Sequence, residues 1–494
     1  MSRHFLKAVF CRVLATTCGL VSGLISIKLY SSHFTPELYG AVLLGLTIMS
    51  YLPLLDGGVS MIVNRSLLTG ENNLSRSQVI KFFQVFYSFF LVVIFWVSTI
   101  CMTVYAHTPT AAAAGQPLFF FWALGLAATM VMFGSARVGL LVGLGSQPSL
   151  FLLNALSTST NVFALWIALK IGCGVWAFPI SNFASQAVVM PIGFWIISKR
   201  QPGFKFLTFA IDDEFWRIFH LLKNESWMYF KTQIAITLLF TVDLIIVGIY
   251  CGPAQVAVYG MLSRLFAIIR AFLQATGEAA WPILMKEKGS IIQFSDPLLR
   301  VNALLYGSVM GGAAATLIPF CRSYLGACWT ITPIVLSLLT ARFLITGLAT
   351  PGNFVLFGLG RLRTLMRSTI LELVAGCIFA NVLGWLFGMA GVAAGFLLGT
   401  SFGSLAPLIH GYAKATGTRT VPLLQRLWLR ALITFGVSFQ TAFAFAEIFT
   451  GTTVVLAGLG GVLATGVLVG LVTLLRMRQF ALSKETLRRL IEYV

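Results

Sequence analysis

The sequence predicts an all-α polytopic membrane protein, and three observations support this fold class. Hydrophobic residues make up 58% of the 494 residues and charged residues only 10%, whereas water-soluble proteins average about 25% charged residues. Long apolar runs recur along the chain at about the 20-residue length that a helix needs to cross a bilayer. Basic residues concentrate in every second loop between these runs, as expected when the loops alternate between the two sides of a membrane.

The apolar runs indicate about fourteen transmembrane helices. Their centres fall roughly at residues 20, 51, 94, 131, 160, 186, 238, 269, 309, 343, 376, 401, 437 and 464. The first run, from about Val9 to Ser31, is longer than the apolar core of a signal peptide and lacks a small-x-small cleavage site. We therefore interpret it as an uncleaved first helix.

The basic residues also predict the orientation. With a cytoplasmic N-terminus, 27 of the 34 basic residues lie in cytoplasmic segments or the adjoining helix ends. Three lie outside, Lys28, Lys170 and Arg322, and four lie within helices, Lys231, Arg264, Arg270 and Arg342. This asymmetry follows the positive-inside rule and places both termini in the cytoplasm. The net charge of +19 is thus mainly a topology signal, and no nucleic-acid binding is expected.

A weak internal repeat predicts two lobes. Leu29–Gly40 and Ile249–Gly260 share two tyrosines and a glycine at an offset of 220, and "VGLG" at 142–145 matches "FGLG" at 357–360 at an offset of 215. Helices 1–6 and 7–12 would then form two parallel six-helix lobes, with helices 13 and 14 outside the repeat. The expected domains are 1–198, a cytoplasmic linker at 199–226, 227–412, and 413–494 with the last two helices and the tail.

The linker contains an amphipathic segment, "DDEFWRIFHLLKN". At helical spacing, Phe215, Phe219 and Leu222 share one face, and Asp212 or Asp213 would cap the helix. We expect this segment to lie on the membrane surface.

The sequence argues against catalysis and against a bound cofactor or metal. It contains no phosphate-binding G-x-x-x-x-G-K-[ST], no H-E-x-x-H and no paired C-x-x-C motif, and its five histidines are scattered. The external loops are too short for the catalytic loop of a polysaccharide polymerase or ligase, so an enzyme is a minor alternative, as is a non-transporting scaffold. The eight cysteines fit inert apolar positions, although a Cys321–Cys328 disulfide stays open. Transport driven by a gradient is the main interpretation.

Several charged residues fall inside the predicted helices, where each costs about 2.5–3.5 kcal/mol near the bilayer centre. Helix 8 carries Arg264, Arg270 and Glu278, with Arg270, Gln274 and Glu278 four residues apart on one face. Arg342 lies near the middle of helix 10. The carboxylates of Asp243, Glu278, Glu372 and Asp56 are candidates for coupling an ion to transport.

Two explanations for these charges stay open. Buried ion pairs such as Arg270–Glu278 or Arg264–Asp243 could join helices, and Arg12, Lys28, Lys231 and Arg137 could reach the membrane surface from helix ends. Arg270 and Arg342 are too central for that, so we expect them to face a water-filled cavity between the lobes. Guanidinium groups bind phosphate with two hydrogen bonds, which predicts an anionic substrate.

The sequence resembles the polysaccharide-transporter branch of the multidrug/oligosaccharidyl-lipid/polysaccharide (MOP) exporter superfamily, the flippases of the Wzx type. The residues are "ELYGAVLLGLTIMSYLPLLDGGVSMIVNR", Glu37 to Arg65, and "TVDLIIVGIYCGPAQVAVYGMLSRL", Thr241 to Leu265. The resemblance implies a V-shaped pair of lobes in the bacterial inner membrane. It also implies outward movement of undecaprenyl-diphosphate-linked oligosaccharide for O-antigen or exopolysaccharide synthesis, with a polysaccharide polymerase or chain-length regulator as partner.

Two further branches of the superfamily are alternatives. "FCRVL", Phe10 to Leu14, looks like the first-helix arginine motif of lipid II flippases, which implies a headgroup contact for Arg12. The second arginine of that motif is absent, because Cys18 and Gly19 occupy its region. Multidrug extrusion by a MATE-like antiporter is the runner-up, but its cationic drugs would favour an acidic lumen.

Overall fold

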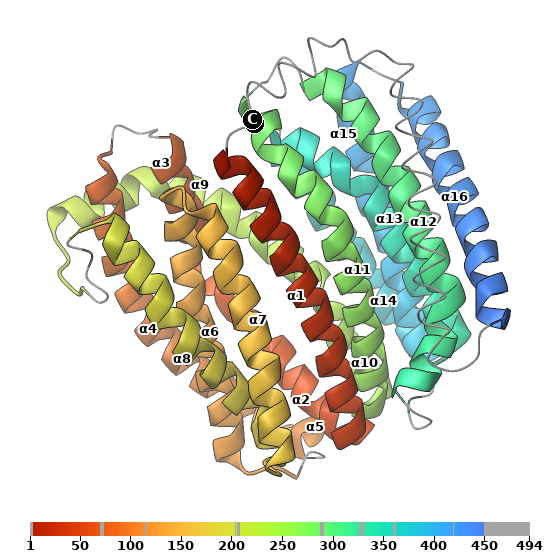
Figure 1. Ribbon diagram of the computed structural model, residues 1–494, viewed down its shortest axis with the longest axis horizontal. Coiled ribbons are helices and arrows are strands. Elements are labelled where there is room, and N and C mark those ends of the chain that lie inside the picture. The colour runs from red at the N-terminus through yellow and green to blue at the C-terminus, as the bar shows by residue number, and fades with distance from the viewer. Residues whose placement is uncertain are drawn as a thin grey trace. The chain divides into compact units, whose positions relative to one another are not determined.

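A computed structural model of the chain describes residues 3–69, 74–112, 115–202, 204, 208–286, 291–325, 329, 331–358, 362–417 and 419–448 (Figure 1). These residues form helices, and no strand occurs among them. Ten helical segments of this part of the chain are long and apolar enough to cross a membrane. The protein is thus an all-α polytopic membrane protein, as the composition predicts. The predicted helix centred on residue 464 and the C-terminal tail lie outside the described residues.

The chain groups into two compact units. The first, called the N-unit, contains Lys7–Gly248 and Gly252–Ala257, and the second, called the C-unit, contains Val258–Val494 with Met1–Leu6 and Ile249–Cys251. The division thus falls near residue 250, some way beyond the linker at 199–226 where we expected a boundary. The two-lobe repeat and its boundaries stay a prediction.

The N-unit is built from helices joined by short turns. Its elements are most of α1 (Arg3–His33), then α2 (Pro36–Met49), η1 (Leu52–Asp56), α3 (Val59–Thr69), α4 (Arg76–Ala106), α5 (Pro109–Ala112), α6 (Leu118–Gly143), α7 (Gln147–Lys170), η3 (Gly174–Trp176), α8 (Ala177–Arg200), α9 (Asp213–Leu239) and most of α10 (Val242–Cys251). The C-unit contains most of α11 (Pro253–Lys286), then α12 (Ile291–Leu325), α13 (Pro333–Gly358), α14 (Leu362–Gly399), the π-helical η4 (Thr400–Leu405), α15 (Ala406–Thr416) and α16 (Thr420–Ile448).

The second predicted membrane helix is broken in the middle. We expected one membrane helix centred near residue 51, but α2 ends at Met49, a 3-10 turn follows, and α3 starts at Val59. Gly57 and Gly58 hold φ angles of 62° and 79°, which side chains with a Cβ rarely adopt. A hydropathy window averages over this break, although the sequence "LPLLDGG" carries the proline and glycines that cause it.

The predicted linker and the predicted seventh membrane helix share one helix. The amphipathic segment at 212–224 belongs to α9, which continues without a break to Leu239 and is interrupted only at Phe240 and Thr241. The predicted cap is confirmed, because the Asp212 carboxylate accepts a hydrogen bond of 2.9 Å from the Phe215 amide. No glycine or proline lies within α9, so the helix has no reason to stop where hydropathy changes.

Helix α9 packs against α3, α4 and η1 within the N-unit (Figure 1). Phe215 stacks on Phe82 of α4, with ring centroids 5.1 Å apart. Asp212 and Glu214 form ion pairs with Lys81, and the hydrogen bond from Lys81 holds the pKa of the Asp212 carboxyl below its usual range. These contacts hold the start of α9 against α4.

In the C-unit, the two arms of α14 on either side of Gly388, the second continuing into η4, fold back on each other with close backbone contact. Gly388, with φ 58° and ψ −136°, interrupts the helix. Beyond it, Gly395, Gly399 and Gly403 lie four residues apart, and a Cβ at each would fall within 2.5 Å of the opposite arm's backbone. This spacing puts them on one helix face, where small residues allow close approach. The arm they contact carries Glu372.

The cysteines give no sign of a disulfide in the described part of the chain. Cys321 is a free, buried thiol, and Cys328 lies outside the described residues.

Candidate functional site

Four neighbouring helices of the C-unit each contribute one polar side chain to a common cluster. Arg270 of α11 interacts electrostatically with Tyr306 of α12, Arg342 of α13 and Glu372 of α14. Three of these four are residues that the sequence analysis singled out, so the fold brings together charges that are up to 102 positions apart. We call Arg270, Tyr306, Arg342 and Glu372 the arginine cluster.

The arginine cluster is buried and carries more positive than negative charge. Only 4% of Arg342 and 5% of Glu372 is exposed, and Arg270 is half-buried. Both arginines carry a positive charge at neutral pH, whereas Glu372 supplies at most one negative charge. Positive charge therefore exceeds negative charge within these four groups. Guanidinium groups pair readily with phosphate and carboxylate oxygens, so the composition of the cluster suits an anion.

Packing holds Arg342 in place. Its guanidinium lies over the ring of Phe396, 4.8 Å from the centroid, in a cation–π arrangement that typically contributes about 0.5–2 kcal/mol. Its backbone carbonyl accepts a hydrogen bond of 2.9 Å from Thr346 one turn later. A second hydroxyl, that of Thr350, bonds to the Thr346 carbonyl. The helix thus presents a row of polar groups beside the arginine.

Tyr306 reaches the arginines because α13 has a glycine opposite its ring. A Cβ on Gly347 would lie 1.9 Å from Cδ1 of Tyr306, so only glycine leaves room for the ring. The side-chain amide of Asn302, one turn before Tyr306, donates a 2.6 Å hydrogen bond to the Gly347 carbonyl. Tyr306 itself is fully buried. Sequence analysis missed Tyr306, because a tyrosine in an apolar helix is common and the glycine that accommodates it lies 41 positions away.

The backbone around Glu372 is packed unusually closely. A Cβ on Gly403 would lie 2.2 Å from the Glu372 Cα atom, and Gly403 belongs to the π-helical segment η4. Such π segments are rare and often mark functional sites. Nothing in the sequence indicated this π segment.

Two of the other carboxylates predicted for ion coupling, Asp56 and Asp243, lie in the N-unit. Asp56, at the break between α2 and α3, is 8% exposed and accepts hydrogen bonds from the Gly58 amide (2.7 Å), the Ser60 hydroxyl (2.6 Å) and the Tyr87 hydroxyl (3.1 Å). Three donors on one carboxylate fix the turn that breaks the helix. Its hydrogen bonds thus give Asp56 at least a structural role.

Asp243 occupies the second helix break of the N-unit. It is 4% exposed, sits in the first turn of α10, and accepts a 2.9 Å hydrogen bond from the Leu244 amide. Thr241 at the break donates a 2.8 Å hydrogen bond to the Tyr51 hydroxyl beside the other break. The two interrupted helices therefore meet at their breaks, an arrangement that transporters use to place ion sites.

The remaining predicted residues lie apart from these groups. The Arg12 guanidinium lies 5.2 Å from the ring centroid of Phe151 in α7. Arg264 is half-buried in α11. The side chain of Glu278 lies outside the described residues, so its predicted role is untested. Within the described chain no group of three metal-binding side chains occurs.

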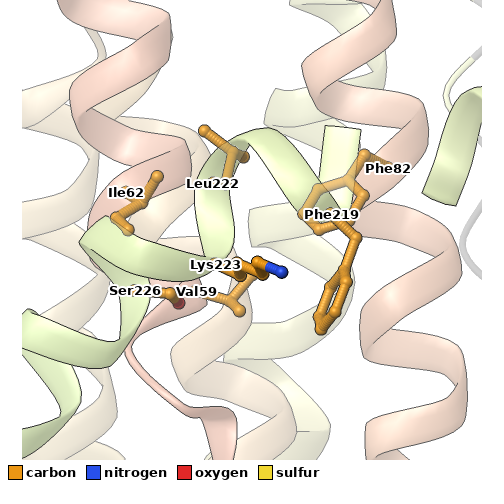
Figure 2. Close-up of a pocket in the computed structure, with 7 residues that line it drawn as sticks. All are labelled: Val59, Ile62, Phe82, Phe219, Leu222, Lys223 and Ser226. Carbon is orange, nitrogen blue, oxygen red and sulfur yellow. The ribbon is translucent and has the colours of Figure 1, made fainter. Parts of the chain in front are cut away.

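A small hollow lies beneath α9 in the N-unit (Figure 2). Val59, Ile62, Phe82, Phe219, Leu222, Lys223 and Ser226 line about 220 Å³ of space that is partly open to solvent. The lining is apolar apart from Lys223 and Ser226, and it contains none of the predicted site residues. Its position reflects the packing of α9 on α3 and α4.

Comparison with known proteins supports the fold. No protein-family model and no curated protein matches the chain. Among solved structures, the lipid II flippase MurJ in an inward closed conformation is 15% identical, with 94% of this chain and 98% of that chain covered and a TM-score of 0.71. An outward-facing and an inward-facing multidrug resistance MATE family transporter of the MOP superfamily are 16% and 15% identical.

The two MATE comparisons cover 85% and 84% of this chain and 96% and 99% of those chains, with TM-scores of 0.59 and 0.61. At such identities the likeness concerns the fold. The chain therefore shares its fold with a flippase and with transporters of this superfamily, and it does so over most of its length.

Proposed function

We propose that the protein is a flippase that moves lipid-diphosphate-linked oligosaccharide, an O-antigen or exopolysaccharide repeat unit, from the cytoplasmic to the outer leaflet by alternating access. The observation that carries this proposal is the buried arginine cluster, in which Arg270 interacts electrostatically with a second arginine, Arg342, and with one carboxylate, Glu372. Two guanidinium groups suit a diphosphate, because each can donate two parallel hydrogen bonds to phosphate oxygens.

The net charge of the arginine cluster distinguishes this proposal from the MATE-like alternative. A drug cation needs an excess of negative charge at its site, whereas the four residues of the arginine cluster carry more positive than negative charge. A lipid II flippase is the second candidate, favoured by the likeness to MurJ and by the Phe151 contact that places Arg12 against α7. We place lipid II second because Cys18 and Gly19 occupy the region of the second first-helix arginine.

The proposed setting is the bacterial inner membrane with both termini in the cytoplasm, as the distribution of basic residues predicts. Arg264 and Arg12 are proposed as further substrate contacts. Asp243, Glu278, Glu372 and Asp56 are proposed as the carboxylates through which a proton or sodium ion could couple to transport. A polysaccharide polymerase or chain-length regulator would receive the exported unit.

The test uses Arg270→Ala, Arg342→Ala and the corresponding lysine variants in a deletion strain. Surface polysaccharide is the readout, at matched abundance of the protein in the membrane. Arg367 of α14, which is exposed, supplies the control Arg367→Ala. We expect both cluster alanine variants to lose most surface polysaccharide and the control to keep it. The lysine variants should keep part of it if charge alone matters.

Full activity of both cluster variants would refute the proposal. To separate the two candidates, the wild-type gene is also placed in a strain that has lost its lipid II flippase. Restored growth there, without any effect on surface polysaccharide, would assign the protein to peptidoglycan precursor transport. Resistance to cationic drugs, lost in the same arginine variants, would favour the MATE-like function.

A further inference from the structure

A stripe of neutral polar side chains runs along α7 in the N-unit and is not explained by the arginine cluster. Asn154, Ser157, Thr158 and Asn161 are spaced three or four residues apart, so they share one helix face. Each of them is half-buried. Phe151 lies one turn before Asn154 on the same face. From Phe151 to Asn161 the stripe extends about 15 Å at 1.5 Å per residue.

Helix α8 faces this stripe with polar residues of its own. The hydroxyls of Ser157 and Ser185 lie 2.9 Å apart, and the Asn161 amide donates a 3.3 Å hydrogen bond to the Asn182 side-chain oxygen. Ser185 and Gln186 are buried, and Asn182 is half-buried. We call these residues of α7 and α8 the amide stripe.

Helix packing uses only part of the hydrogen-bonding capacity of the amide stripe. The side-chain oxygen of Gln186, a residue only 6% exposed, accepts no hydrogen bond from the described residues. The Asn154 side chain likewise makes no hydrogen bond within the described part of the chain. Buried polar groups are nearly always paired, and leaving an amide unpaired is unfavourable. Polar contacts that served only to join two membrane helices would need no such spare donors and acceptors.

The chemistry of the amide stripe fits a sugar. Its side chains carry amides and hydroxyls, which both donate and accept hydrogen bonds, and it contains no charged group that would select an ion. Sugar hydroxyls likewise donate and accept. Moreover, the Arg12 guanidinium of α1 lies 5.2 Å from the Phe151 ring centroid of α7. A cation thus stands at one end of the neutral stripe.

We propose that the amide stripe binds the sugar part of a lipid-diphosphate-linked oligosaccharide, whose hydroxyls take up the hydrogen-bonding groups that helix packing leaves unused. This inference rests on the proposed function and adds to it the residues that recognise the glycan.

The test measures binding to the full-length protein in nanodiscs. The two probes are lipid-linked oligosaccharide isolated from cells that carry the protein, and undecaprenyl diphosphate without sugar. The variants are Asn154→Leu and Asn161→Leu, which remove the amides at similar volume. Ser159→Ala is the control, because Ser159 is an exposed polar residue of α7 outside the stripe.

Wild-type protein should bind the sugar-bearing probe more tightly than the bare one. Each asparagine variant should weaken binding of the sugar-bearing probe by about three- to ten-fold, as expected when one neutral hydrogen bond is lost, and should leave binding of bare undecaprenyl diphosphate unchanged. Ser159→Ala should change neither. If Asn161→Leu fails to reach the membrane because its bond to Asn182 is lost, Asn154→Leu alone decides.

Four results would overturn the inference. Equal affinity of the wild type for both probes, or unchanged affinities in the asparagine variants, would remove the sugar site while leaving the proposed function intact. Equal weakening for both probes, together with lowered thermal stability, would show that the stripe only packs α7 against α8. If the wild type binds neither probe, the proposed function itself fails. The effect of Arg270→Ala on binding could then not be measured either.

Discussion

Replacing Gly347 by alanine tests how the arginine cluster is built. The new Cβ would lie 1.9 Å from Cδ1 and 2.2 Å from Cε1 of Tyr306, whereas carbon atoms in contact are about 3.5 Å or more apart. The ring would have to move by roughly 1.6 Å to restore that separation. Tyr306 is fully buried and has no free space to enter. Overpacking of this kind typically costs about 1–3 kcal/mol.

The assay is thermal unfolding of the purified protein in detergent, followed by intrinsic fluorescence, with transport measured in parallel. We expect Gly347→Ala to lower the unfolding midpoint and to reduce transport, because Tyr306 moves away from Arg270. Gly352→Ala in the same helix is the matched control, since a Cβ there meets nothing within 4 Å. In a Tyr306→Leu background the cost of Gly347→Ala should shrink. Equal midpoints for Gly347→Ala, Gly352→Ala and the wild type would refute the reasoning.

Four further predictions concern the break in helix 2, the topology, the linker and the energy source. Asp56→Asn should destabilise the protein by about 1–3 kcal/mol, more than Tyr87→Phe, because the carboxylate accepts three hydrogen bonds; equal denaturation midpoints for the two variants would contradict this. In a background without native cysteines, Ala112→Cys beyond one end of α4 should react with an impermeant maleimide from outside, and Ser77→Cys at its other end should not; the reverse pattern would invert the predicted orientation. The pKa of Asp212 is lowered by Lys81, so the linker contact is fully present above the unfolded pKa of about 3.9 and is lost as the pH falls through the lower folded value. Amide hydrogen exchange near Phe215, corrected for intrinsic pH effects, should therefore rise below that range, and Lys81→Gln should abolish the step. Finally, a membrane potential that is negative on the cytoplasmic side should speed outward flipping in proteoliposomes, since it contributes roughly 2.3 kcal/mol per 100 mV for each net negative charge moved; a rate that ignores the potential but follows pH or sodium would indicate electroneutral coupling.

The sequence predicts the charged members of the site better than their surroundings. Arg270, Arg342 and Glu372 were identifiable because a charge inside an apolar run is costly and needs a reason. Tyr306 and Gly347 carry no such signal, since each is ordinary in a membrane helix and only their juxtaposition matters. The meeting of Arg270 with Arg342 and Glu372 depends on which helices are neighbours, and hydropathy does not contain that information.

The helix boundaries show a similar contrast. Apolar runs locate the membrane helices, but the break between Met49 and Val59 was not predicted, because a window of about 20 residues centred near residue 51 averages over it. The signal was nevertheless present in "LPLLDGG". By contrast, the change in hydropathy near residue 226 does not mark a helix end, because α9 continues through it to Leu239. The π-helical turn at Thr400–Leu405 has no recognisable signature in the sequence.

The two arms of α14 on either side of Gly388, which pack through glycines, have a consequence for how the chain enters the membrane. The arms are adjacent in sequence, turn at Gly388 and fit together backbone to backbone at Gly395, Gly399 and Gly403. They can therefore insert into the bilayer together as one hairpin during synthesis. In such a hairpin the backbone of Gly403 already lies against Glu372 during insertion. The carboxylate is then not exposed to lipid on all sides when it enters the hydrocarbon. A larger residue at Gly403 should then reduce the yield of inserted protein before it affects any step of transport.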